Sequence, residues 1–286
     1  MKGLSTLVLC AIGFVASQAA PEPPKRPPIL GIDHVALRSS DVPGARAFYG
    51  DLLGLAVSES TVLTVTINAR QRVFVEPGLP AGTDERLLHI ALATSDLDGM
   101  ATYLRARGVT FDGPSRGMTC GSRGLRTADP DGHTIELVQE SAIVGSPRES
   151  ALALSARLLH AGVTVRDEAA ASGFYHDVIG MDEIWRGGAD PAKASWVNMR
   201  MPEGTDYLEY MLRDSPSSRR QLGIDHHICL LVPDIQSAWE QVRERTAVVN
   251  RAALEPPRIG RNLRWQLNLY DPDGTRVELM EPASAR

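Results

Sequence analysis

This 286-residue chain has few cysteines, few aromatic residues and no large excess of charge of either sign. Of its three cysteines, Cys10 lies in an N-terminal apolar segment, and only Cys120 and Cys229 lie beyond it. The sequence therefore does not describe a disulfide-stapled scaffold. Its net charge is −5, and its Lys and Arg residues are scattered without a basic run or an aromatic stacking platform. These absences argue against nucleic acid as a partner.

Long hydrophobic runs are also absent, except at the N-terminus. Residues 1–20 contain Lys2, an apolar stretch over 4–15 and small residues up to Ala20, which is typical of a cleaved signal peptide. The apolar stretch is too short to span a bilayer comfortably. We therefore expect a secreted or periplasmic protein with no membrane association after cleavage. Residues 21–29 are rich in proline and predict a stiff spacer.

The dominant signal beyond this point is internal repetition. The segment DPDGHTIELV at 129–138 returns as DPDGTRVELM at 271–280, and a Phe-Tyr-x-Asp-x-x-Gly motif at 48–54 returns at 174–180. Histidines at the start of apolar alternating runs match in the same way, His34 with His160 and His89 with His227. Each repeat predicts one supersecondary unit, a strand followed by a helix and further strands.

The repeats divide the chain into two halves of ordinary domain size. We place domain 1 at 30–142, a linker at 143–156, domain 2 at 157–282 and a short tail at 283–286. Each half contains two units, and the last strand of each half carries a glutamate, Glu136 or Glu278.

These motifs resemble those of the vicinal oxygen chelate superfamily, which includes glyoxalase I, fosfomycin-resistance proteins, extradiol dioxygenases and bleomycin-binding proteins. The resemblance covers nearly all of the chain beyond residue 30. It implies an α+β fold of four βαβββ modules, paired into two glyoxalase-like domains with cupped mixed sheets.

The resemblance also implies a metal site in domain 2. Its four candidate ligands are His160, Glu209, His227 and Glu278. Two imidazoles and two carboxylates suit one divalent ion such as Zn, Ni, Co, Mn or Fe(II). Strand alternation turns His226 away from His227, and the match with His89 favours His227 as the ligand.

Domain 1 offers a less complete set at the matching positions. Its candidate second site consists of His34, His89 and Glu136, with Glu76 as the fourth ligand if the alignment slips by two residues. The alternative alignment places Phe74 at the fourth position. We therefore interpret domain 1 as holding a degenerate or three-ligand site.

A polar row also stands out in domain 2. The run 263–269 alternates, so that Arg264, Gln266 and Asn268 share one face of a predicted strand. Such a row is either a solvated face or the lining of a substrate cavity.

We expect a small-molecule ligand and a monomer or homodimer. The resemblance leaves three functions open. In the first, a lyase or isomerase, the metal chelates two oxygens of a small oxygenated substrate and Glu209 or Glu278 transfers the proton. Export argues against glutathione or CoA thioesters, which are cytosolic. The second function is that of an Fe(II) extradiol-type dioxygenase, against which the extra Glu209 argues. The third is a non-enzymatic drug- or antibiotic-binding protein, which has no need of four metal ligands.

Overall fold

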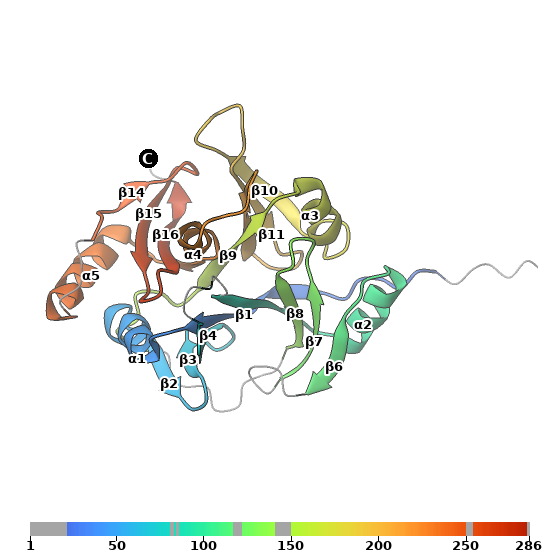
Figure 1. The fold of residues 1–286 in the computed structure, drawn as a ribbon, viewed down its shortest axis with the longest axis horizontal. Helices are drawn as coiled ribbons and strands as arrows, with labels where there is room; N and C mark the ends of the chain where they lie inside the picture. The colour runs from blue at the N-terminus through green and yellow to red at the C-terminus, as the bar shows by residue number, and fades with distance from the viewer. Residues whose placement is uncertain are drawn as a thin grey trace, which may run out of the picture.

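The computed structural model describes residues 22–80, 83, 86–116, 122–140, 150–249 and 254–284. It consists of two eight-stranded mixed sheets, one in each domain, as the α+β duplicated fold predicts (Figure 1). The fold prediction is therefore confirmed. The predicted signal peptide, residues 143–149 of the predicted linker and Cys120 lie outside the described residues.

The sheet of domain 1 is built from two modules that meet at its centre. Its strands in spatial order are β2 (Ala56–Glu59), β3 (Leu63–Thr66), β4 (Arg72–Pro77), β1 (Ile29–Ser39), β5 (Leu87–Thr94), β8 (Thr134–Gln139), β7 (Arg123–Ala128) and β6 (Asp112–Arg116). β1 pairs in parallel with β4 and antiparallel with β5, so the first strands of both modules lie side by side.

Domain 2 repeats this order strand for strand. Its strands are β10 (Asp182–Gly187), β11 (Trp196–Arg200), β12 (Tyr207–Leu212), β9 (Leu158–Val165), β13 (Ile228–Leu231), β16 (Arg276–Ser284), β15 (Arg264–Tyr270) and β14 (Arg258–Ile259). The central pairings match too, because β9 is parallel to β12 and antiparallel to β13. The four histidines at the starts of the repeats thus come to the middle of the two sheets.

The helices of the modules start at short polar caps. They are α1 (Val42–Arg46) with the π-helical η1 (Ala47–Leu52), α2 (Leu97–Ala106), α3 (Glu168–Tyr175) and α5 (Ile235–Val249). Asp41, Asp96 and Asp167 each accept a backbone N–H of the first turn. In Figure 1, α1 and α5 lie on one side of the molecule and α2 and α3 on the other. No helix among the described residues has the length and apolarity that crossing a membrane requires.

Each Asp-Pro-Asp-Gly turn connects its own sheet to the other domain. The first aspartates, Asp129 and Asp271, accept two backbone N–H groups within their own turns. The second aspartates reach across the domain boundary: Asp131 binds Arg166, and Asp273 binds Ser39 and Ser40. One buried apolar cluster includes residues of both domains. The two halves therefore pack as one body.

One local prediction is wrong. Strand alternation places His226 and His227 in a strand, but α4 (Arg219–Asp225) occupies the chain up to Asp225, His226 caps this helix, and β13 begins only at Ile228. Ser218 caps this helix by accepting the N–H of Gln221, and Arg213 forms an ion pair with Asp225 at its last turn. These polar contacts outweigh the apolar alternation that predicted a strand.

Candidate metal centre

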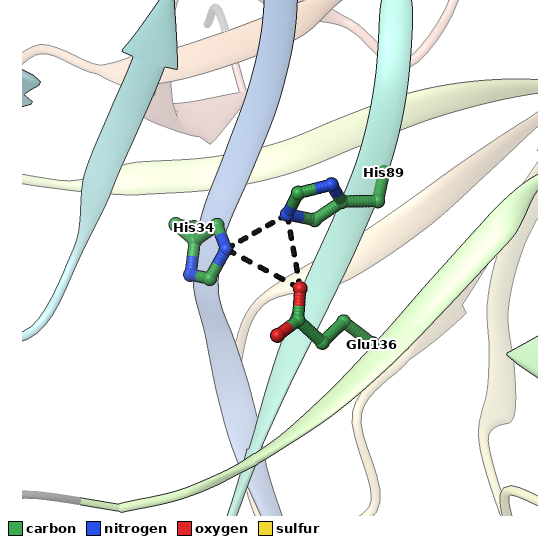
Figure 2. A group of neighbouring side chains, drawn as sticks. All are labelled: His34, His89 and Glu136. Atoms are coloured by element: carbon green, nitrogen blue, oxygen red, sulfur yellow. Dashed lines mark hydrogen bonds and ion pairs between the residues drawn. The ribbon is translucent and has the colours of Figure 1, made fainter. Parts of the chain in front are cut away.

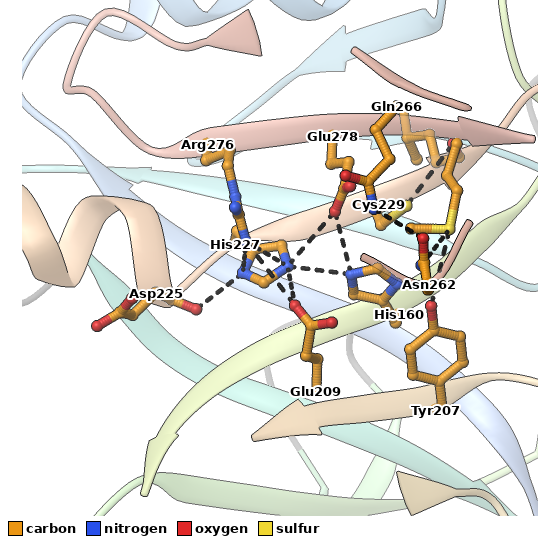
Figure 3. Close-up of polar contacts among 12 residues, drawn as sticks. His160, Tyr207, Glu209, Asp225, His227, Cys229, Asn262, Gln266, Arg276 and Glu278 are labelled. Carbon is orange, nitrogen blue, oxygen red and sulfur yellow. Dashed lines mark hydrogen bonds and ion pairs between the residues drawn. The ribbon is translucent and has the colours of Figure 1, made fainter. Parts of the chain in front are cut away.

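Four side chains of domain 2 converge in the cup of its sheet (Figure 3). They come from β9, β12, the residue before β13, and β16: His160, Glu209, His227 and Glu278. The Nε2 atoms of the two histidines are 3.0 Å apart. A Glu278 oxygen lies 3.5 and 3.8 Å from them, and a Glu209 oxygen lies 3.4 Å from His227 Nε2. All four residues are buried, so the structure brings the whole predicted set together.

The orientation of His227 is fixed by its immediate surroundings. Its Nδ1 donates to the carbonyl oxygen of Asp225, 2.9 Å away, which leaves the lone pair of Nε2 directed at the site. The ring packs directly over Gly162, where a Cβ atom would stand 2.1 Å from Nδ1. Only glycine allows this approach, and Gly162 is also the residue paired with Glu209 in the sheet.

The ionisation of the site favours a cation. Burial, and next the charge of Arg276, lower the pKa of His227 well below its usual range, so that the imidazole is neutral. Burial alone would raise the pKa of Glu278, but the hydrogen bond with His160 and the charge of Arg276 lower it. Neutral imidazole and ionised carboxylate are the forms that bind a metal.

Arg276 competes with a cation at this site. Its Nη2 lies 2.9 Å from both ring nitrogens of His227 and 3.9 Å from a Glu209 oxygen. Because Nδ1 of His227 already donates to Asp225, only Nε2 is free to accept. Arg276 and a metal ion would therefore use the same lone pair.

The sheet beneath the site is apolar and close-packed. The ring of Tyr207 stacks on His160 at 4.5 Å between centroids, and a second, small buried cluster contains Tyr207, Cys229 and Met280. The thiol of Cys229 lies close enough to His160 and Glu278 to form a group of potential ligands with them. Burial raises the pKa of this thiol well above its usual range, so the thiolate that a metal requires is disfavoured.

A cavity of about 320 Å³ opens onto Glu209 and Glu278. Two tryptophans, Trp185 and Trp196, form part of its wall. Its basic lining residues are Arg258, Arg261 and Arg276. A divalent ion would balance the two carboxylates, so the arginines would then leave the cavity with a net positive charge.

The predicted polar row of β15 is only partly at this cavity. Gln266 lines it. The guanidinium of Arg264 instead lies 4.0 Å from the sulfur of Met280, and Asn268 pairs with Glu278 in the sheet, its side-chain oxygen buried without a partner.

Domain 1 brings three of its four predicted residues together, from β1, β5 and β8 (Figure 2). The Nε2 atoms of His34 and His89 are 3.0 Å apart. An oxygen of Glu136 lies 3.1 Å from His89 Nε2 and 3.9 Å from His34 Nε2. Burial, followed by the charge of His34, lowers the pKa of His89 to about 3, whereas burial raises the pKa of Glu136.

Phe74 stands at the fourth position of domain 1. The sheet pairs Ala36 with Phe74, as it pairs Gly162 with Glu209 in domain 2, and the edge of the Phe74 ring packs on His34 at 4.9 Å. Glu76 lies two residues further along β4, half-buried opposite Arg38, and does not join the histidines and Glu136.

Three other histidines lie away from both sites. His226 caps α4 and meets His133 of domain 1, with 3.1 Å between their Nε2 atoms. It thus faces away from His227, as alternation predicted. His176 is more than half exposed and contacts the carbonyl oxygen of Met181.

Both clusters fit a divalent metal ion in donor type and spacing. Ligand atoms about 2.0–2.2 Å from one ion must lie within about 4.4 Å of each other. The distances among His160, His227 and Glu278 meet this limit, as does that between Glu209 and His227. The distances among His34, His89 and Glu136 meet it too. Nitrogen and carboxylate oxygen together suit Zn, Ni, Co, Mn or Fe(II).

The chain belongs to the Glyoxalase/Bleomycin resistance protein/Dioxygenase superfamily. The model of this family matches residues 31–137 and 157–279, once in each domain. The resemblance inferred from the repeats is thus confirmed. No curated protein matches the chain.

Solved structures of similar fold include three 2,3-dioxygenases. The chain aligns with homoprotocatechuate 2,3-dioxygenase from Brevibacterium fuscum at a TM-score of 0.71 and 20% identity, covering 91% of this chain and 82% of that one. The homoprotocatechuate 2,3-dioxygenase from Arthrobacter globiformis aligns at a TM-score of 0.71 and 19% identity, covering 91% of this chain and 82% of that one. The 2,3-dioxygenase LapB from Pseudomonas sp. KL28 aligns at a TM-score of 0.70 and 14% identity, covering 91% of this chain and 94% of that one. At these identities the likeness shows the fold.

Several residues at the domain 2 site were not predicted. Arg276 carries a signal, because it lies two residues before Glu278 and alternation places both on one face of β16. Cys229 carries the same kind of signal, because it lies two residues after His227. The Asp225 carbonyl has no such signal, since it depends on where α4 ends.

Proposed function

We propose that domain 2 is the active site of a metal-dependent lyase or isomerase that acts on a small oxygenated substrate. One observation carries the proposal: two histidines and two glutamates converge at the end of a cavity of about 320 Å³. A divalent ion at these residues would act as a Lewis acid that polarises a bound carbonyl and acidifies the neighbouring C–H.

Within this site we assign the general base to Glu209. Glu278 lies near both histidines, and its lowered pKa makes it a weak base and a suited permanent ligand. Glu209 forms an ion pair with only one of the two histidines, His227, and its side chain is 11% exposed and lines the cavity. It would remove the proton from the carbon beside the carbonyl and return it to the adjacent carbon.

The walls of the cavity support a class of substrate. Arg258, Arg261 and Arg276 favour a substrate that carries a carboxylate or another anion, and Trp185 and Trp196 offer flat apolar surface. We further propose that the protein is exported, supported by the signal-like residues 1–20. Its substrate would then be neither a glutathione adduct nor a CoA thioester.

Hydrogen exchange tests this proposal. Zinc-loaded protein in D₂O is incubated with hydroxypyruvate, an anionic α-hydroxy ketone, and with neutral dihydroxyacetone, and proton NMR follows deuterium at the hydroxymethyl carbon. We expect exchange that is faster with hydroxypyruvate and is lost in Glu209→Gln, while the metal bound to domain 2 remains. Exchange that survives in Glu209→Gln would refute the role of this residue.

An extradiol-type dioxygenase is the second candidate function, favoured by the fold that the chain shares with ring-cleaving dioxygenases over 91% of its length. It predicts oxygen uptake when the Fe(II)-loaded protein is given catechol. Uptake without hydrogen exchange would replace the first proposal with this one. Ligand binding without either reaction would indicate a binding protein.

A further inference from the structure

We propose that domain 1 holds a second divalent metal ion through His34, His89 and Glu136. This goes beyond the proposed function, which requires one ion in domain 2. The ion in domain 1 would be structural, whereas the ion in domain 2 faces a cavity.

The geometry of the three side chains is that of a ligand set. Their inward atoms form a triangle with sides of 3.0, 3.1 and 3.9 Å, which places a common point about 2 Å from each. Each atom comes from a different strand of the sheet centre, where the backbone pairing fixes its position.

The second contact of His34 is the one that metal-binding histidines make. Its Nδ1 lies 2.6 Å from a carboxylate oxygen of Asp33, to which it donates. This leaves the lone pair of Nε2 facing the other two ligands. A carboxylate behind a histidine in this way orients the ring and raises its basicity toward a metal.

Glu136 has an acceptor that protein contacts leave unsatisfied. Its side chain is fully buried, and one oxygen, Oε1, has no hydrogen-bond partner. The other oxygen is 3.4 Å from Arg126, a long contact for an ion pair. A buried carboxylate without compensation is costly, and bidentate binding to a cation would satisfy both oxygens. Two nitrogens and two carboxylate oxygens then complete a four-coordinate site.

The site is enclosed, which argues for a structural ion. The side chains of His34 and Glu136 have no exposed surface, and that of His89 is 5% exposed. Phe74 covers the position that Glu209 takes in domain 2. This site therefore has no counterpart of Glu209, the carboxylate proposed as the general base in domain 2.

Metal stoichiometry tests the inference on the full chain. The protein is stripped with a chelator, reloaded with Zn(II), freed of excess metal and analysed by mass spectrometry, beside His89→Ala, His227→Ala and the double variant. We expect about two equivalents in the wild type, one in each single variant and none in the double variant. His176→Ala, which removes an exposed histidine, should retain two.

The failures of the two proposals are distinguishable. One equivalent in the wild type that is lost in His227→Ala and kept in His89→Ala would overturn the inference and leave the proposed function intact. One equivalent lost only in His89→Ala would uphold the inference and remove the metal from the proposed active site.

A milder variant guards against misfolding of His89→Ala. Asp33→Asn keeps every ligand and should weaken zinc in domain 1 by about 10–100-fold, measured by chelator competition, while the domain 2 ion is unaffected. Replacing zinc with Co(II) gives a second readout, because the visible absorption of each bound ion is independent of activity. Equal zinc affinity of Asp33→Asn and wild type at both sites would count against the inference.

Discussion

The two domains place equivalent residues at equivalent positions of one sheet, yet their sites differ in a few side chains. At the fourth position Glu209 of domain 2 becomes Phe74 in domain 1. Among the described residues, one arginine contacts the candidate ligands of each site, but it comes from a different strand: Arg276 on β16 in domain 2 and Arg126 on β7 in domain 1. One carboxylate exchanged for a ring thus separates an open four-ligand site from an enclosed three-ligand one.

Exchanging the fourth residue between the domains should give the largest effect. Glu209→Phe removes the proposed base and one ligand, and we expect proton exchange on hydroxypyruvate to fall by about 10²–10⁴-fold. Because His160, His227 and Glu278 remain, domain 2 should still bind zinc, more weakly. Undiminished exchange would show that Glu209 has no part in the chemistry.

The reciprocal change, Phe74→Glu, places a carboxylate at the fourth position of domain 1. Phe74 is 4% exposed, so a carboxylate there is buried. Without metal, the variant should lose several kcal/mol of stability. Zinc should restore it and bind more tightly than in the wild type. Thermal unfolding with and without zinc measures both effects, and Phe74→Leu is the matched control, which should show no added zinc dependence.

The first aspartates of the two turns should respond to pH in opposite directions. Burial raises the pKa of Asp271 to about 6, from an ordinary value of 3.8. Burial would also raise the pKa of Asp129, but hydrogen bonds from His133 and Tyr175 lower it. Asp271 therefore contributes stability that is complete below about pH 4 and is lost as the pH rises through 6. Asp129 contributes stability that is complete above about pH 4 and is lost at lower pH.

Urea unfolding between pH 3 and 8 tests this contrast. A shift of about two pKa units corresponds to about 3 kcal/mol, so Asp271→Asn, which keeps the acceptor oxygen, should remove a fall of that order between pH 4 and 6. Asp129→Asn should instead destabilise the protein at neutral pH. Parallel curves for both variants would contradict the assignment.

Arg276 should produce the smallest of these effects. Charges of +1 and +2 about 4 Å apart repel by about 2 kcal/mol even at the dielectric constant of water, so Arg276→Gln should bind zinc at least about tenfold more tightly. The gain should be smaller for Arg126→Gln, because the Arg126 side chain is 40% exposed. Chelator competition measures both, with the exposed Arg200→Gln as control. A weaker zinc affinity in Arg276→Gln would mean that the arginine supports the site.

Most of the architecture was predictable because the sequence repeats itself. Matching histidines, the Asp-Pro-Asp-Gly turns and strand alternation indicate which residues face the cup. Features that depend on packing were not accessible in this way. The end of α4, which supplies the Asp225 carbonyl behind His227, depends on a cap and an ion pair. The choice between Phe74 and Glu76 required the sheet register, since alternation gives both the same face.

The reach of each turn into the other domain has a consequence for unfolding. Asp131 and Asp273 anchor strands that carry Glu136 and Glu278, and the apolar cluster is continuous between the halves. The two domains should therefore melt in one cooperative transition. By mass action, an ion bound in either cup would raise the melting temperature of the entire molecule, so each domain would gain heat resistance from metal that only its neighbour holds.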